Sequence, residues 1–184
     1  MPSLESKFKK ILTQDQDFKT TLAVIIKVSV GQIWLIGGAV YKRLLTSIHG
    51  KELLVGDYDF IVENVKEPLP KLDDWTFSYN SFENPRFSNK KGLVIDLVPL
   101  NNICELKKRG WKPSILNYLQ KVPFSVQAVA FNIKTGKLIG AGLADIKNGV
   151  IRINDEPSYN YIVAQHGEKV DLNHMAKKLK LNIV

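Results

Sequence analysis

Early in the sequence, a strand pattern changes to a helix pattern across a glycine pair, which limits the folds open to the chain. Gln32 to Ile36 has the length and apolar character of a short strand, and Gly37-Gly38 follows it directly. From Ala39 to about Ile48 apolar residues recur at helical spacing, and Gly50 can supply the left-handed residue that ends a helix. A strand that turns sharply into a helix predicts a domain in which helices pack against a β-sheet.

Helix and strand patterns continue along the rest of the chain. The expected helices are Leu4 to Val28, Leu100 to Leu119 with a break at Gly110 and Pro113, and Asp171 to Leu181. The expected strands are Tyr58 to Val62, Leu93 to Val98, a hairpin of Phe124 to Ile133 with Lys137 to Ile139, and a turn and strand within Ile146 to Ile153. We therefore expect an α+β (mixed α/β) fold, with a mixed β-sheet, flanking helices and a short C-terminal helical appendage.

The length of 184 residues fits one domain with small additions. We expect an N-terminal helical segment (1–30) packed on a central domain (31–155), followed by a helical segment (156–184). No apolar run reaches the roughly 18 residues of a membrane span, and the N-terminus lacks a signal-peptide pattern. We therefore expect a cytoplasmic protein with no membrane partner. The single cysteine, Cys104, excludes an internal disulfide, and we expect it to be buried.

The chain is basic, with 26 Lys and Arg against 18 Asp and Glu, a net charge of +8 and a pI near 9.5. This charge favours an anionic partner, nucleotide or nucleic acid first, although solvated surface lysines alone would also produce it.

Three aspartates are candidates for metal chemistry. Asp57 and Asp59 flank Tyr58, and side chains two apart on a strand point to the same face. Asp96 lies inside the apolar strand pattern LVIDLVPL, where a carboxylate is costly unless it is paired. Carboxylate oxygens are the ligands that Mg²⁺ prefers, and two such ions can stabilise a phosphoryl-type transfer. A metal shared by all three residues would satisfy Asp96.

Each of these features has an ordinary explanation when taken alone. Gly37-Gly38 is compatible with a simple tight turn, and Asp57-Tyr58-Asp59 with a polar turn that enters a strand. Asp96 is compatible with a hydrogen-bonded acid near a strand end. The order of the features is more informative, because a glycine pair opens a helix, an Asp-x-Asp follows on the next strand and a third Asp lies on a later strand.

This order resembles the nucleotidyltransferase superfamily that includes DNA polymerase β. More narrowly, it is similar to the head domain of bacterial poly(A) polymerases and CCA-adding tRNA nucleotidyltransferases. The similar stretches are LIGGAVYKRLL, GDYDFIVE, VIDLVPL and FSVQAVAFNIKTGKLIGAGLADIKNGVIRI, which span roughly Ile33 to Arg152. The resemblance implies that 31–155 is a nucleotidyltransferase domain and that 156–184 is a truncated, neck-like helical segment.

The resemblance also implies roles for individual residues. Gly37 and Gly38 would bind the triphosphate, and Lys42 or Arg43 would supply positive charge to a phosphate. Asp57, Asp59 and Asp96 would be catalytic and would bind two Mg²⁺ ions. The expected activity is transfer of NMP from an NTP to an acceptor hydroxyl with release of pyrophosphate. Basic charge favours RNA as the acceptor, and a protein or a small molecule is the alternative.

The sequence departs from the family pattern in several places. The family's Arg-Asp step after the glycine pair is Tyr41-Lys42 here, and its Arg-Arg-Asp motif before the hairpin is absent. The Asp of its Leu-Ile-Asp-Pro step is Gly140, and we find no base-reading Glu-Asp-x-x-Arg motif in the neck. These losses support an alternative, a non-catalytic module that binds nucleotide or RNA on the same scaffold.

A further alternative is a homodimer or a partner chain that supplies the missing body. The stripe of Leu172, Met175 and Leu179 on the last predicted helix is the surface expected to dock such a partner.

Overall fold

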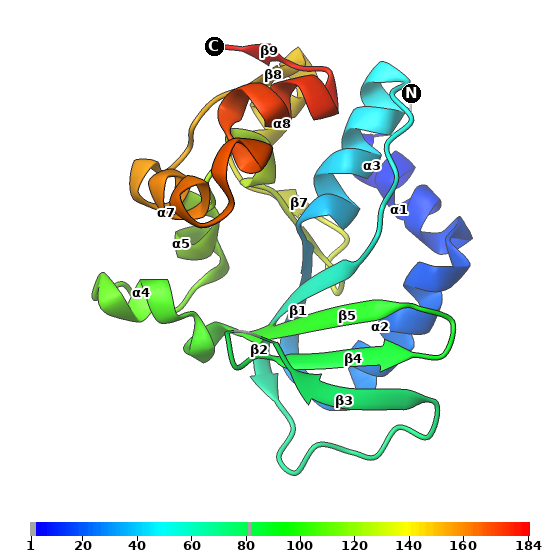
Figure 1. Cartoon of the computed structure of the whole chain (residues 1–184). Helices are drawn as coiled ribbons and strands as arrows, with labels where there is room; N and C mark the ends of the chain where they lie inside the picture. The colour runs from blue at the N-terminus through cyan, green and yellow to red at the C-terminus, as the bar shows by residue number, and fades with distance from the viewer. Residues whose placement is uncertain (1–2, 81) are drawn as a thin grey trace.

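The middle layer of the structure is a mixed seven-stranded sheet with the order β3-β4-β5-β2-β1-β6-β7 (Figure 1). The computed structural model describes residues 3–80 and 82–184. The strands of this sheet are β1 (Ser29–Ile36), β2 (Tyr58–Val65), β3 (Trp75–Tyr79), β4 (Pro85–Asn89), β5 (Val94–Pro99), β6 (Ala130–Asn132) and β7 (Leu138–Ile139). β2 and β5 are parallel, and the neighbouring pairs are antiparallel. A small parallel pair is formed by β8 (Val150–Ile151) and β9 (Asn182–Ile183).

Helices cover both faces of the sheet. They are α1 (Leu4–Gln14), α2 (Gln16–Val28), α3 (Gly38–His49), α4 (Cys104–Lys108), α5 (Ile115–Gln120), α6 (Gly142–Asn148), α7 (Glu156–His166) and α8 (Leu172–Leu179). Three short 3₁₀ turns, η1 (Leu100–Asn102), η2 (Ser125–Gln127) and η3 (Gly167–Val170), connect them. These elements confirm the expected α+β fold with a mixed sheet and flanking helices.

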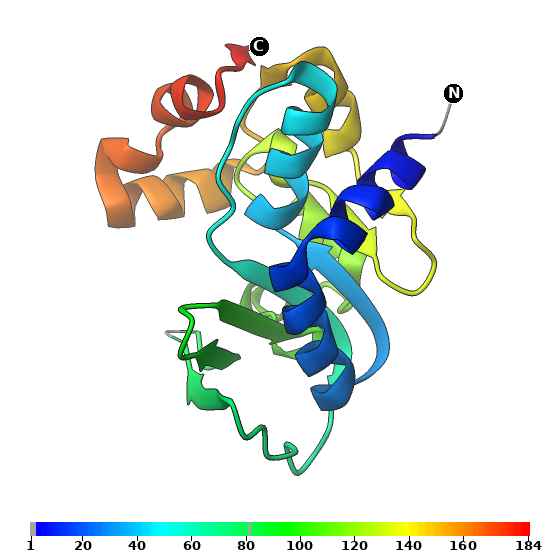
Figure 2. The ribbon, with the colours of Figure 1, turned by 90° about the vertical axis from the view of Figure 1, so that its right-hand side faces the viewer.

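Two apolar clusters hold the layers together, one on each face of the sheet. On one face, α1, α2 and α3 pack on β1, β2 and β5, and Figure 2 shows α1 and α2 crossing this face. On the other face, Trp34 and Ile61 of the sheet pack against Leu106 and Leu119 of α4 and α5. Because side chains alternate along a strand, Tyr58 and Phe60 face the first cluster, and Asp59 and Ile61 face the second. The alternation therefore places Asp59 on the α4–α5 side of the sheet.

The N-terminal helix differs from the prediction, because two helices replace the single helix expected from Leu4 to Val28. Asp15 takes an extended conformation between them, and its side chain accepts a hydrogen bond from the backbone N–H of Phe18. The Asp15 carboxylate therefore caps the N-terminus of α2, where free amides need an acceptor. Helical periodicity continues through the break, which is why the pattern did not reveal it.

The segment before β5 also differs, since it contains the two strands β3 and β4 that were not predicted. β3 is an edge strand whose residues are exposed or half-buried, and β4 is only five residues long. Neither strand carries a long apolar run or a clear one-sided alternation, so the period-2 signal was weak. β4 becomes a strand through its backbone pairing with β5, in which Arg86 lies opposite Asp96.

The C-terminal half required further corrections. The break expected at Gly110 and Pro113 is confirmed, since it separates α4 from α5, but the 3₁₀ turn η1 replaces the start of the expected helix, and only short strands remain of the expected hairpin. Ile146 lies in α6 instead of a turn, while β8 is the strand expected within Ile146 to Ile153. The helix α7 falls within the segment 156–184 that was expected to be helical, although the pattern did not define it as a separate helix. The helix α7 has no buried residue, so it lacks the apolar stripe by which helices are recognised in a sequence.

The surface expected to dock a partner is used inside the chain. Met175 and Leu179 of α8 are 8% and 1% exposed and belong to the same apolar cluster as α1 and α3. The prediction of a dimer or partner interface through this stripe was therefore wrong, because the amphipathic face of α8 already has its partner. Asp171 caps α8, as the sequence indicated.

Two remaining expectations concern the surface and the membrane. Cys104 is exposed at the start of α4, in contrast to the buried position expected for it. Within residues 3–80 and 82–184, no helix combines the length and the apolar character that crossing a bilayer requires.

Candidate active site

The three predicted aspartates lie together at one end of the sheet. Asp59 on β2 is directly opposite Asp96 on the parallel strand β5, and Asp57 immediately precedes β2. One carboxylate oxygen from each residue lies within 4.8 Å of the other two. The parallel pairing of β2 and β5 produces this arrangement, since it brings residues 37 positions apart into register.

The carboxylates experience different environments. Asp57 is exposed, Asp59 is partly buried and Asp96 is buried. Burial, together with the negative charges of Asp57 and Asp96, raises the pKa of Asp59 to about 7, and the nearby Arg86 opposes this effect. A carboxyl group that is costly to ionise without a cation is a strong ligand once a cation is supplied.

The donor set fits a hard divalent cation. Three carboxylates at this spacing provide oxygen ligands, which Mg²⁺ prefers, and the exposure of Asp57 leaves one side open to water or substrate. Asp57, Asp59 and Asp96 could therefore hold Mg²⁺, where the ion would supply charge to a phosphate group.

The glycine pair lies beside Asp59. Gly37 follows the last residue of β1, Ile36, which is paired with Asp59 across β1 and β2. Gly37 has φ +67°, and a Cβ at this position would lie 2.6 Å from Oδ2 of Asp59. The position requires glycine both for its backbone conformation and for the space that the carboxylate occupies. The N-terminus of α3, with its free amides, thus opens next to the acidic cluster.

We expect Gly37→Ala to weaken the site. The new Cβ collides with Oδ2 of Asp59, and the alanine must also adopt a positive φ. The free energy of unfolding should therefore fall by about 1–3 kcal/mol. Calorimetry should also show weaker Mg²⁺ binding, since the Asp59 carboxylate must move. The matched control is Gly38→Ala, whose Cβ would meet only the flexible end of Lys42 at 3.4 Å or more. Equal effects of both substitutions on metal binding would contradict the prediction.

Of the two basic residues predicted to contact phosphate, Lys42 lies near the aspartate cluster and Arg43 does not. Lys42 lies against Gly38 and donates a hydrogen bond from Nζ to the backbone carbonyl of Leu54 at 2.9 Å. Burial and the nearby Lys178 of α8 lower the pKa of Lys42, whereas Asp57 raises it. Lys42 thus provides positive charge near Asp57, and Lys178 lies near Lys42.

Arg43 is directed to the other side of the sheet. Its guanidinium pairs with the carboxylate of Asp15 and donates to the hydroxyl of Tyr58 at 3.1 Å. Because Tyr58 faces the α1–α3 cluster, Arg43 connects α2, α3 and β2 and is not brought to the carboxylates. The order of residues in the helix explains this, since Lys42 and Arg43 differ by about 100° around its axis.

The structure adds residues that the sequence did not indicate. Arg86 and Asn80 both donate hydrogen bonds to Asp96. The buried Tyr41 and the half-buried Tyr118 lie near Asp59, whose negative charge contributes, after burial, to raising their pKa values. Arg86 and Asn80 belong to a segment without a recognised strand, so no register related them to Asp96. Tyr41 occupies the arginine position of the family pattern, which is the signal that could have identified it.

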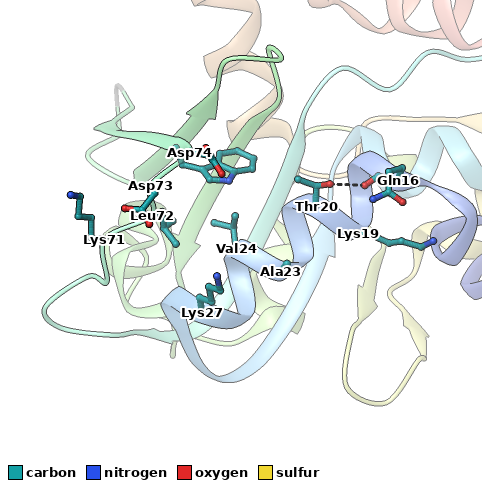
Figure 3. A pocket seen from close by; sticks show the side chains of 11 residues that line it. Gln16, Lys19, Thr20, Ala23, Val24, Lys27, Lys71, Leu72, Asp73 and Asp74 are labelled. Atoms are coloured by element: carbon teal, nitrogen blue, oxygen red, sulfur yellow. Dashed lines mark hydrogen bonds between the residues drawn. The ribbon is translucent and has the colours of Figure 1, made fainter.

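A separate hollow of about 480 Å³ lies between α2 and the segment before β3 (Figure 3). Lys19, Lys27 and Lys71 line it together with Asp73 and Asp74, and none of the three clustered aspartates contributes. Its charges are mixed and its lining lacks the carboxylate cluster. The cluster of Asp57, Asp59 and Asp96 is therefore the candidate site.

Comparison with known proteins gives matches at the level of structure. No protein-family model matches the chain, and no curated protein sequence does. Among solved structures, the match to a CCA-adding enzyme in complex with CTP covers 86% of this chain and 39% of the enzyme's chain, with 22% sequence identity and a TM-score of 0.59. The Thermotoga maritima CCA-adding enzyme complexed with tRNA matches 86% and 38%, with 20% identity and a TM-score of 0.58. The Bacillus stearothermophilus CCA-adding enzyme in complex with CTP matches 100% and 42%, with 19% identity and a TM-score of 0.51.

The chain thus spans about two fifths of the length of these enzymes. At this level of identity the comparison concerns the fold, and it agrees with the order of the sequence motifs. One mixed sheet contains β1, which leads into the glycine turn, β2, which follows Asp57 and carries Asp59, and β5, which carries Asp96. The chain therefore has the nucleotidyltransferase fold found in CCA-adding enzymes.

Proposed function

We propose that this chain is a Mg²⁺-dependent nucleotidyltransferase that transfers NMP from an NTP to an acceptor hydroxyl. The observation that carries the proposal is the cluster of three carboxylates, two on the parallel strands β2 and β5 and one directly before β2, beside the glycine turn that opens α3. Such a cluster next to a helix N-terminus provides both a cation site and a phosphate site. Either feature alone would be unspecific.

The residues divide the work between binding and charge stabilisation. Asp57, Asp59 and Asp96 hold Mg²⁺, which when bound stabilises negative charge on the reacting phosphate. The free amides at Gly38 and Ala39 bind the triphosphate, and Lys42 adds positive charge. The acceptor oxygen forms a bond to the α-phosphorus, the bond from that phosphorus to the β-bridging oxygen breaks, and pyrophosphate leaves. The hydroxyl proton passes to the carboxylate cluster.

The acceptor that we propose is RNA, and the compartment is the cytoplasm. The net charge of +8 suits a polyanionic acceptor, and Lys178 of α8 places additional positive charge near Lys42. Two of the solved structures with this fold are complexes with CTP, and one is a complex with tRNA. These ligands belong to those enzymes, and they suggest the substrates to test first.

A second candidate function is nucleotide binding without transfer. The observation that favours it is the pairing of Asp96 with Arg86, which already neutralises one of the three carboxylates. The loss of the family's arginine after the glycine pair, where this chain has Tyr41, points the same way. This candidate predicts NTP binding with no release of pyrophosphate.

The deciding experiment measures pyrophosphate release from each of the four NTPs, with Mg²⁺ or EDTA and with or without bulk RNA. We expect release that requires Mg²⁺ and is lost in the variant Asp57→Ala/Asp59→Ala. The matched control is Asp73→Ala/Asp74→Ala, which removes the same two charges from an exposed loop and should retain activity. NTP binding without release under every condition would favour the second candidate, and release that persists in the Asp57/Asp59 variant would overturn the assignment of the site.

A further inference from the structure

Arg86 forms a two-point ion pair with the third aspartate of the site. Its Nε donates to Oδ1 of Asp96 at 2.8 Å, and its Nη2 donates to Oδ2 at 2.7 Å. The two residues are opposite each other on the antiparallel strands β4 and β5, so backbone register holds the pair in place. Asn80 adds a hydrogen bond from Nδ2 to Oδ1 of Asp96 at 3.0 Å.

These contacts reduce what Asp96 can offer to a cation. A carboxylate oxygen has two lone pairs, and on Oδ1 of Asp96 both are used by Arg86 and Asn80. Oδ2 accepts from Arg86 and has one position left. Asp57 and Asp59 have no comparable cationic partner within 4.0 Å among the residues that the structure describes. The oxygens that are free for a metal are therefore mainly those of Asp57 and Asp59.

The charge of the cluster leads to the same conclusion. Three ionised carboxylates carry a charge of −3, and the guanidinium of Arg86 reduces it to −2, which one divalent cation balances. A guanidinium remains charged at any ordinary pH, so this contribution is permanent. A second divalent cation would have to bind against a fixed positive charge and a nearly saturated Asp96.

We propose that Arg86 takes the place of one of the two cations, so that the site binds a single divalent cation held by Asp57 and Asp59. Arg86 is then a positioning residue that fixes Asp96 and keeps a positive charge at the site. Its side chain is 43% exposed, and Asp96 uses two of its five N–H groups. The remaining N–H groups are free to donate to a phosphate oxygen. This inference rests on the metal site of the proposed function and corrects its expected number of ions.

The test counts ions bound to the 184-residue chain without nucleotide. Mn²⁺ is titrated at pH 8, and the free ion is followed by electron paramagnetic resonance. We expect one bound Mn²⁺ per chain for the unmodified protein and for Arg86→Lys, which retains the charge. Arg86→Gln restores the charge of −3, so we expect a second Mn²⁺ to bind and the first to bind about tenfold more tightly. A merely structural role of Arg86 would lower affinity and would not add a site.

The matched control is Arg109→Gln. Arg109 forms a similar two-point pair with Asp155, through hydrogen bonds of 2.8 and 2.7 Å, and this pair includes none of the three clustered aspartates. The control should therefore bind one Mn²⁺ with unchanged affinity. Two ions in the unmodified protein, or one ion with unchanged or weaker affinity in Arg86→Gln, would overturn the inference. Two ions together with Mg²⁺-dependent pyrophosphate release would overturn it and leave the proposed function standing, whereas no bound ion in any variant would contradict both.

Discussion

Asp59→Asn should abolish nucleotidyl transfer and at the same time make the protein more stable. The substitution removes a central carboxylate from the cluster, so we expect pyrophosphate release to fall by about a thousandfold or more. The side chain keeps its size, and the cost of burying a charge disappears. Loss of activity together with a gain in stability distinguishes a functional carboxylate from one that supports the fold.

The gain in stability should depend on pH in a defined direction. The pKa of Asp59 is raised from the usual 3.8 to about 7 in the folded protein, mainly by burial and then by Asp57 and Asp96. Between these two values the unfolded chain has released the proton and the folded chain still holds it, so stability decreases as the pH rises. The Asn variant does not lose stability in this way, because asparagine carries no proton to release. Its advantage should be absent below about pH 4, grow between pH 4 and 7, and reach about 4 kcal/mol above pH 7.

Thermal unfolding in EDTA at pH 4, 6 and 8 measures this advantage. The control is Asp57→Asn, at an exposed position, which should reduce activity without a comparable gain in stability. If Asp59→Asn destabilised the protein at pH 8, the ionised Asp59 would have to be a stabilising group, and the electrostatic description of the site would be wrong.

Gly140→Ala should destabilise the protein strongly, by roughly 3–5 kcal/mol. Gly140 has φ +116°, and a Cβ there would lie 2.2 Å from the backbone oxygen of Ala128 and 3.0 Å from Cδ1 of Leu119. The same oxygen accepts a hydrogen bond from the N–H of Gly142 at 2.9 Å, so the two segments cannot separate without losing it. Urea unfolding followed by circular dichroism measures the loss.

Gly92→Ala is the matched control for this substitution. Gly92 also has a positive φ, of +80°, but a Cβ there would meet nothing within 4 Å. Its substitution should cost only about 1 kcal/mol, which is the contribution of backbone strain alone. Similar losses for Gly92→Ala and Gly140→Ala would show that the close approach to Ala128 is not what requires glycine.

Local sequence patterns predicted the structure correctly where the interactions that determine it lie within a few residues. The change from β1 to α3 at Gly37, the end of α3 at Gly50 and the cap of α8 at Asp171 were all predicted. Each depends on a backbone conformation or a capping hydrogen bond within a few residues. The three aspartates that the structure brings together were also candidates, Asp57 and Asp59 through their spacing on a strand and Asp96 through the cost of a carboxylate in an apolar strand.

Strand pairing and side-chain contacts between distant segments could not be predicted from local sequence patterns. β3 and β4 were missed because β4 becomes a strand by pairing with β5 and β3 by pairing with β4, and Arg86 and Asn80 were therefore missed as partners of Asp96. Arg43 was expected at the phosphate site, but it binds Asp15 and Tyr58 on the opposite face of the sheet. The sequence correctly indicated an apolar stripe on α8. It did not reveal that this stripe packs into the core of the same chain.

The sequence by itself determined the order of the central strand–turn–helix unit, the fold class and the three candidate aspartates, because these depend on periodicity, turn chemistry and the cost of burying charge. The tertiary structure alone decided which cation faces which carboxylate. Ion pairs such as Arg86–Asp96 depend on strand register and on which face of the sheet a side chain occupies, and both are set by packing across the whole molecule.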